Sequence, residues 1–271
     1  MNHPAPNSRL IGVFDSGVGG LSVLRALRQR QPALPLLYTA DSGHAPYGDR
    51  NPAHVVERSL KVTQHLIDQG AGLIVIACNT ATAWAIDTLR ERHPTLDLVG
   101  VEPGVKPAVA LSRNRRVGVM ATPSTLASER FASLLARYAN DCKILGVGCR
   151  GLAAAIEQGE IACEQVDQLL DLYCAELRQA EVDTAVLGCT HYPFVAERIA
   201  QRLGPEVQLL DTADAVARQA LNLWVARHPE RASDNGNKGQ VRLQSTGDTT
   251  VLARLAREQL GLFEPVENIA L

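Results

Sequence analysis

The feature that most constrains this sequence is a pattern of four strands and intervening helices that is written twice. Short β-branched runs alternate with longer helical patterns, which predicts parallel strands in an α/β fold. The third run of each set ends at a cysteine, and Cys189 follows Cys78 by 111 residues. The fourth runs, at Leu96 and Val207, are also 111 residues apart. The first runs, at Ile11 and Val117, are 106 residues apart, a difference that a loop insertion would absorb. This nearly constant spacing predicts two similar α/β halves.

The first set of strands is expected at Leu10–Asp15, Leu36–Ala40, Leu73–Ala77 and Leu96–Val101. The second set is expected at Val117–Ala121, Lys143–Val147, Thr184–Gly188 and Val207–Leu210. Helices are expected from Leu21, at Ala53–Gln69, near Thr80–Arg92 and at Ala213–Arg227. The chain then shows a polar stretch at His228–Gly239, a strand at Val241–Gln244, a helix near Thr250–Leu260 and a tail. We predict one domain of residues 1–102 and 212–271 and a second of residues 103–211. Each has a mostly parallel sheet flanked by helices, with an active site in the cleft between them.

Composition excludes several classes of function. The 271 residues carry a formal charge of −2, so no basic field indicates nucleic acid or an anionic membrane as partner. The polar start, Met1–Arg9, lacks the apolar core of a signal peptide, and no run approaches the length of a membrane span. We therefore expect a cytoplasmic protein whose six cysteines are thiols. Of the four lysines, only Lys106 could be argued for a pyridoxal-phosphate Schiff base, and nothing around it resembles a phosphate cradle.

The two cysteines at strand ends are the candidate chemical groups. Ligands of open α/β sheets lie beyond the carboxyl ends of the strands, where Cys78 and Cys189 are both expected. Each is followed by polar residues and a predicted helix start, which would favour an anion and lower the pKa of the thiol. If the halves face each other, the two thiols approach one ligand from opposite sides. Two bases on opposite faces of one carbon invert its configuration, which indicates a racemase or epimerase.

At these residues the sequence resembles the glutamate racemases of the aspartate/glutamate racemase superfamily. The resemblance covers about residues 11–212, with a weaker similarity at Val241–Asp248. The matching segments, in order, are GVFDSGVGGLSVL at 12–24, APYG at 45–48, VIACNTA at 75–81, GVEPGVKPA at 100–108, VGVMAT at 117–122 and LGCTHYP at 187–193.

The resemblance implies interconversion of L- and D-glutamate without a cofactor or metal, supplying D-glutamate for peptidoglycan in a bacterium. It implies that Cys78 takes the proton from D-glutamate and Cys189 from L-glutamate, assisted by Asp15, His191 and Glu157. The substrate contacts implied are Asp15, Ser16, Tyr47, Gly48, Asn79, Thr80, Thr190 and His191. Members of the family often form homodimers. The segment at 149–153 departs from the Cys-Pro pattern that often precedes the assisting glutamate.

Other interpretations stay open at this stage. Aspartate and hydantoin racemases share the two-cysteine logic, so specificity for glutamate is not fixed. Gly17-Val18-Gly19 after a strand, with Asp41 further on, imitates a dinucleotide-binding fingerprint, although Ser22 stands at the third glycine position. Cys189 and His191 could belong to a zinc hydrolase, but no further ligands come at a recognisable spacing. A two-domain binding module would share the cleft.

Overall fold

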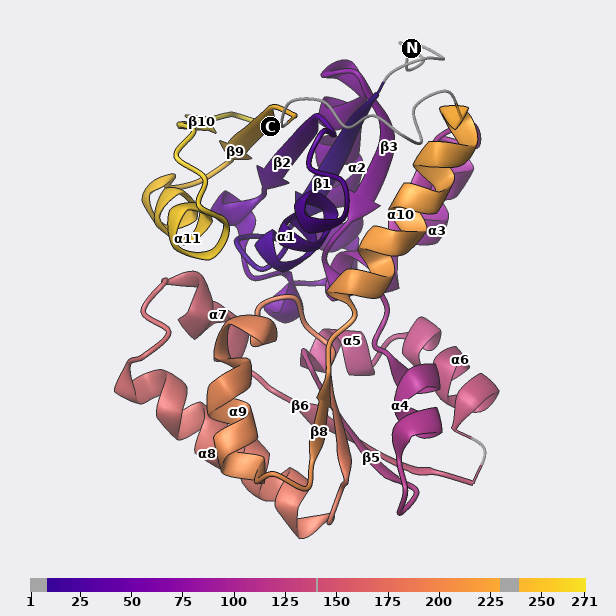
Figure 1. Ribbon diagram of the computed structural model, residues 1–271, viewed down its shortest axis with the longest axis vertical. Coiled ribbons are helices and arrows are strands. Elements are labelled where there is room, and N and C mark those ends of the chain that lie inside the picture. Colours follow the sequence, from indigo (N-terminus) through magenta and orange to yellow (C-terminus); the bar gives the residue numbers. More distant parts are fainter. Residues whose placement is uncertain (1–8, 140, 230–238) are drawn as a thin grey trace.

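Two parallel sheets with flanking helices form the frame of the molecule (Figure 1). The computed structural model describes residues 9–139, 141–229 and 239–271. The strands of the first sheet are β1 (Leu10–Asp15), β2 (Leu36–Ala40), β3 (Ala71–Ile76), β4 (Asp97–Gly100), β9 (Val241–Ser245) and β10 (Val266–Asn268). The strands of the second sheet are β5 (Arg116–Ala121), β6 (Lys143–Gly148), β7 (Thr184–Leu187) and β8 (Gln208–Leu210).

The helices divide between the two sheets. Those of the upper lobe in Figure 1 are α1 (Leu21–Arg30), α2 (Pro52–Asp68), α3 (Asn79–Arg92), α10 (Ala213–Arg227) and α11 (Thr250–Leu260). Those of the lower lobe are α4 (Val105–Leu111), α5 (Pro123–Leu126), α6 (Glu129–Tyr138), α7 (Leu152–Glu157), α8 (Glu164–Gln179) and α9 (Ala196–Leu203). Short 3₁₀ turns lie at Ser42–His44, Tyr47–Asp49 and Tyr192–Val195.

The two halves share one strand order, which confirms the predicted α/β fold with two similar sheets. The first sheet runs β10-β9-β2-β1-β3-β4 and the second runs β6-β5-β7-β8, with every pair parallel. In both halves the chain therefore changes direction between its first and third strands. Such a switch point is where an open parallel sheet binds its ligand. Asp15 ends β1 and Cys78 follows β3, so these two residues flank the first switch point.

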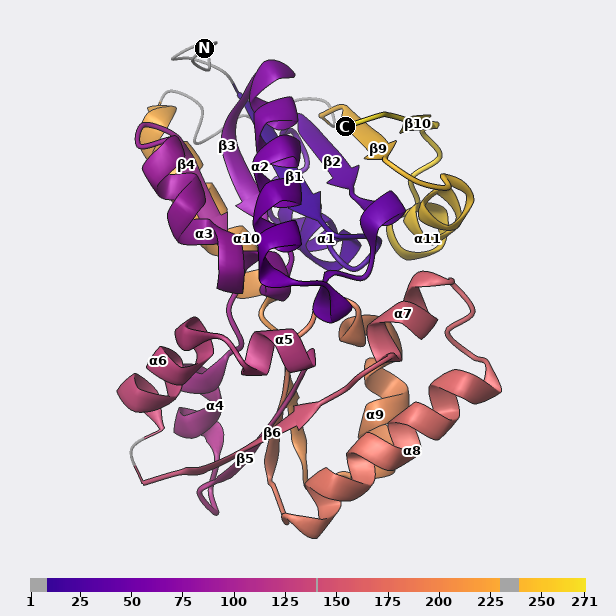
Figure 2. The ribbon, with the colours of Figure 1, turned by 180° about the vertical axis from the view of Figure 1, so that it is seen from behind.

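Both faces of the first sheet are buried, which explains why its strands are apolar almost throughout. Val13 and Tyr38 belong to the core on the side of α1 and α10, where Trp224 also packs. Phe14 and Ile74 belong to the core on the side of α2 and α3. Figures 1 and 2 show these helices on opposite faces of the sheet. This double layer holds the carboxyl ends of β1 and β3 in a fixed register.

The last part of the chain returns to the first sheet. Strand β9 pairs with β2, with Tyr38 opposite Leu243. Strand β10 then pairs with β9 in a region where the sequence predicted only a tail. The prediction was wrong there because β10 has only three residues, too few for a periodic pattern.

The domain division stays a proposal. We place the boundaries near residues 102 and 211, where the chain passes from β4 to α4 and from β8 to α10. Residues 230–238 of the predicted polar stretch lie outside the described residues. Within the described part of the chain, no helix combines the length and apolarity needed to cross a membrane.

Candidate active site

The first half contributes a thiol and a carboxylate from neighbouring strand ends. The N–H of Ala77 donates to the carbonyl of Phe14 at 2.7 Å, which brings Cys78 beside Asp15. The Asp15 carboxylate is fully buried and accepts from the backbone N–H of Ser16 at 2.6 Å and from its hydroxyl at 3.2 Å. The sulfur of Cys78 lies 3.6 Å from the Ser16 hydroxyl oxygen, to which the thiol donates. Ser16 therefore links the two groups.

Cys78 caps α3, but the expected lowering of its pKa is wrong. The N–H of Ala81 does donate to the Cys78 sulfur, at 3.4 Å. Burial nevertheless raises the pKa of Cys78 well above its usual range, and the negative charge of Asp15 raises it further. Here the free-energy penalty of removing a thiolate from water is larger than the stabilisation of that thiolate by the N-terminus of α3. The negative charge of Cys189 also contributes to the raised pKa of Cys78, so the two sulfurs lie within electrostatic reach of each other.

The second half contributes Cys189, Thr190 and His191 from the turn after β7. We predicted a helix start directly after Cys189, but the chain forms a 3₁₀ turn at Tyr192–Val195 and α9 begins only at Ala196. Thr190 donates its hydroxyl to Asp15 of the first half, at 3.0 Å. The ring nitrogen Nδ1 of His191 lies 3.7 Å from the Cys189 sulfur.

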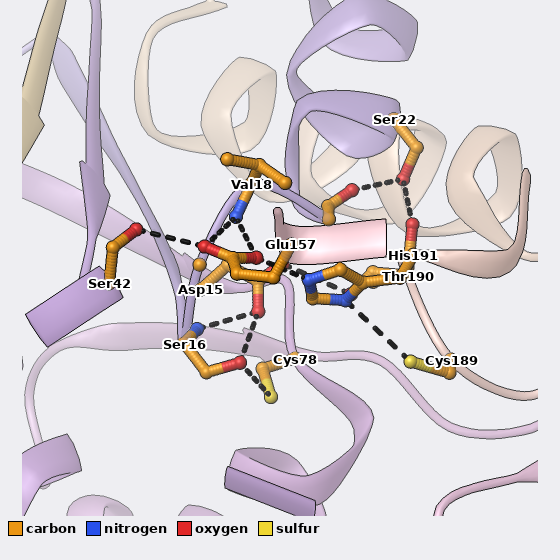
Figure 3. Close-up of polar contacts among 12 residues, drawn as sticks. Asp15, Ser16, Val18, Ser22, Ser42, Cys78, Glu157, Cys189, Thr190 and His191 are labelled. Atoms are coloured by element: carbon orange, nitrogen blue, oxygen red, sulfur yellow. Dashed lines mark hydrogen bonds and ion pairs between the residues drawn. The ribbon is translucent and has the colours of Figure 1, made fainter. Parts of the chain in front are cut away.

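Glu157, at the end of α7, inserts between the two halves (Figure 3). Its carboxylate accepts from the Val18 backbone N–H at 2.9 and 3.2 Å, and Nε2 of His191 lies 2.6 Å from its Oε2. A β-carbon at Gly17 would come within 2.2 Å of this carboxylate, and one at Gly19 within 2.4 Å of the His191 ring. Glycine is therefore required here because the other half of the molecule approaches the backbone so closely.

Charge is distributed unequally around the two sulfurs. Burial alone would lower the pKa of His191, but its hydrogen bonds to Cys189 and Glu157 outweigh burial and raise that pKa well above the usual range. His191 therefore favours its imidazolium form, held between the Cys189 sulfur and the Glu157 carboxylate. Burial raises the pKa of Asp15 to about 6, against the lowering effect of His191. The Cys189 side thus carries a cation, and the Cys78 side carries a carboxyl group that can hold a proton near neutrality.

The remaining predicted contacts lie around the same strand ends. The Tyr47 hydroxyl is turned away to Asp41, to whose Oδ2 it donates at 2.6 Å. Gly48 lies against Thr122, where a β-carbon would meet the methyl group at 2.5 Å. Asn79 donates weakly to the Val101 carbonyl at 3.5 Å. The hydroxyl of Thr80 lies 3.0 Å from that of Thr122 in the second half.

Sequence reasoning missed the roles that three residues have in this region. Ser42 donates its hydroxyl to Oε1 of Glu157 at 3.0 Å, and nothing in its sequence surroundings signals this contact. Asp41 forms a fully buried ion pair with Arg58, which lies 17 residues further on in α2. Thr122 could have been found, because it follows β5 as Asp15 ends β1.

The geometry opposes two alternative interpretations. In a dinucleotide-binding fold the glycine turn receives a pyrophosphate, but here the turn at Gly17–Gly19 receives Glu157 and His191. Asp41, the candidate ribose ligand, is instead bonded to Arg58 and Tyr47. Against a zinc site, both ring nitrogens of His191 already have protein partners. Among the described residues no group of three or more His, Cys, Asp or Glu side chains is arranged to hold a metal ion.

Comparison with known proteins decides the family. Residues 11–220 match the Asp/Glu/Hydantoin racemase family. The chain belongs to this family. It is 49% identical to the glutamate racemase of Ralstonia pickettii over 251 residues, which cover 93% of this chain and 88% of that protein.

Solved racemase structures share the whole fold. Glutamate racemase isoform RacE1 of Bacillus anthracis has a TM-score of 0.86 and 29% identity, over 98% of this chain and 99% of its own. Escherichia coli glutamate racemase, in complex with L-glutamate and the activator UDP-MurNAc-ala, has a TM-score of 0.81 and 31% identity, over 97% and 98% of the two chains. The two-sheet architecture is therefore that of the racemases.

Proposed function

We propose that this chain is a glutamate racemase that moves the α-proton of its substrate between Cys189 and Cys78. The observation that carries the proposal is the meeting of the two switch points, which brings a thiol from each half to one polar cluster (Figure 3). Glutamate as substrate is supported by the names of the relatives and by the L-glutamate held by the Escherichia coli enzyme.

In the direction from L- to D-glutamate, the Cys189 thiolate takes the α-proton and forms an S–H bond. The electron pair of the broken C–H bond stays on the α-carbon. The thiol of Cys78 then gives its proton to the opposite face of that carbon. D-glutamate leaves with Cys189 as thiol and Cys78 as thiolate, and the reverse reaction restores the first state.

The surroundings of each sulfur fit this order of proton transfers. The His191 imidazolium is placed to stabilise negative charge on Cys189, and Glu157 holds the ring in position. The raised pKa of Cys78 suits a group that arrives as a thiol and donates. The α-hydrogen of an amino acid is far less acidic than a thiol, so fixed charges and dipoles must supply most of the rate enhancement.

The assignment of the substrate contacts follows the same geometry. Ser16 contacts the Cys78 thiol, Asn79 and Thr80 follow Cys78 in the chain, and Thr190 follows Cys189, while the turn at Tyr47-Gly48 lies against Thr122. We assign the enzyme to the cytoplasm and to the supply of D-glutamate for peptidoglycan, without a cofactor or metal. Assembly as a homodimer stays a prediction.

The test follows the circular dichroism signal of the amino acid with L-glutamate, D-glutamate and L-aspartate in turn, after the protein has been dialysed against a chelator. We expect racemisation of both glutamate enantiomers, with deuterium from D₂O at the α-carbon of the product. Cys78→Ser and Cys189→Ser should each lose racemisation, whereas Cys142→Ser, a control outside the cluster, should keep it. Full activity in either variant of the first pair would refute the two-thiol mechanism, and turnover of aspartate alone would refute the substrate.

A further inference from the structure

Ser42 is a polar contact of Glu157 that the mechanism above does not use. Its hydroxyl donates to Oε1 of Glu157 at 3.0 Å, while Oε2 of the same carboxylate faces His191 at 2.6 Å. The Val18 N–H donates to both oxygens. The carboxylate is thus held on two sides by the first half of the molecule and presents its remaining lone pairs to the imidazolium.

A buried ion pair fixes the backbone that carries Ser42. Asp41 is fully buried and accepts hydrogen bonds from Nε and Nη2 of Arg58 at 2.9 and 2.8 Å. It also accepts from the hydroxyls of Tyr47, at 2.6 Å, and Thr246, at 2.7 Å. Four donors therefore satisfy this carboxylate, and the Asp41 N–H donates to the Asp15 carbonyl at 2.9 Å. Ser42 follows directly on a residue that cannot shift without breaking these bonds.

From these contacts we infer that Ser42 is a positioning residue for proton transfer at Cys189. It acts through Glu157, which orients His191 against the Cys189 sulfur. The inference rests on the proposed function, because proton transfer at Cys189 is a step of the proposed mechanism. Within the described part of the chain, the Ser42 hydroxyl bonds to Glu157 and to neither Cys78 nor Ser16, so its influence should fall on one of the two proton transfers. The Asp41–Arg58 pair supplies the rigid base from which the hydroxyl reaches Glu157.

The experiment compares Ser42→Ala with Ser42→Thr and with a matched control, Ser59→Ala. Ser59 is a buried serine of the first half whose hydroxyl donates to the Val55 carbonyl within α2, whereas Ser42 is half-buried. Loss of one hydrogen bond to a charged acceptor should lower kcat/KM of Ser42→Ala roughly tenfold. Ser42→Thr keeps the hydroxyl and should recover most of this loss. Ser59→Ala should match the wild type.

Deuterium isotope effects identify which transfer is slowed. With α-deuterated L-glutamate, the label is removed by Cys189, so the isotope effect on kcat/KM should be larger in Ser42→Ala than in the wild type. With α-deuterated D-glutamate, Cys78 removes the label, and the isotope effect should be smaller. General loosening of the site would change both effects in the same direction.

The outcomes separate this inference from the proposed function. An unchanged kcat/KM in Ser42→Ala, isotope effects that move together, or the opposite asymmetry would each overturn the role of Ser42. Wild-type protein that turns over neither enantiomer would instead overturn the proposed function. A loss in Ser42→Ala with the stated asymmetry and recovery in Ser42→Thr would support the inference.

Discussion

The buried carboxyl group of Asp15 should weaken the fold that contains it. Its side chain is fully buried, and burial raises the pKa of Asp15 from 3.8 to about 6. A raised pKa means that the folded protein holds this proton more tightly than the unfolded chain does. The contribution of the protonated Asp15 carboxyl group to the free energy of unfolding is therefore fully present below pH 4 and is lost as the pH rises through 6. At about 1.4 kcal/mol for each tenfold change, the loss above pH 6 is about 3 kcal/mol.

Replacing Asp15 by Asn removes the charge and keeps most hydrogen bonds. The amide oxygen can still accept from the Ser16 N–H and hydroxyl, and the amide nitrogen can donate to the Thr190 hydroxyl, where Asp15 now accepts. We expect Asp15→Asn to be more stable than the wild type at pH 8 by about 2–3 kcal/mol. The difference should shrink steadily below pH 6. Racemisation should fall, because Cys78 loses its acidic neighbour.

The assay is urea unfolding of both proteins at pH 4.5, 5.5, 6.5 and 8, followed by circular dichroism. Asp68→Asn, at an exposed position on α2, serves as the control and should follow the wild-type pH profile. A stability difference that does not change with pH would refute the reasoning. So would an Asp15→Asn protein that is less stable than the wild type at pH 8.

Two further substitutions test the contacts between and within the halves. Gly19→Ala would place a methyl group 2.4 Å from a ring nitrogen of the second half, so kcat/KM should fall at least about a hundredfold. The control Gly148→Ala meets nothing closer than 3.5 Å and should keep its activity in the same circular dichroism assay. Arg58→Met would leave Asp41 buried without its cation and should cost about 3–5 kcal/mol in urea unfolding at pH 7. Arg30→Met, which removes an exposed ion pair, should cost under about 1 kcal/mol, and equal losses in the two variants would contradict this account.

Local patterns predicted the frame well because both sheets are built from apolar runs of ordinary length. The strand that ends at Asp15 and the strands that precede Cys78 and Cys189 begin and end within a few residues of their expected positions. The repeat of 111 residues also corresponds to a real repeat, since the same strand order occurs twice. Strand β10 could not be predicted, because three residues at a sheet edge leave no pattern.

Features that depend on how the halves meet could not be obtained from the sequence. The glycine turn at Gly17–Gly19 looks like a phosphate site until Glu157 is seen to fill it. The direction of the Cys78 pKa was predicted wrongly because a helix end is visible in a sequence, whereas the degree of burial is not. Ser42 gave no signal at all, since its partner lies 115 residues away in the other half.

The unequal neighbours of the two sulfurs have a thermodynamic consequence. Mirror-image amino acids have the same free energy in water, so the equilibrium constant between them is one. The ratio kcat/KM must then be equal for both enantiomers, whatever the protein does. The imidazolium beside one sulfur and the carboxyl group beside the other can therefore make kcat differ between the enantiomers only if KM differs by the same factor. The enantiomer that saturates this enzyme at lower concentration must also be the one that it converts more slowly.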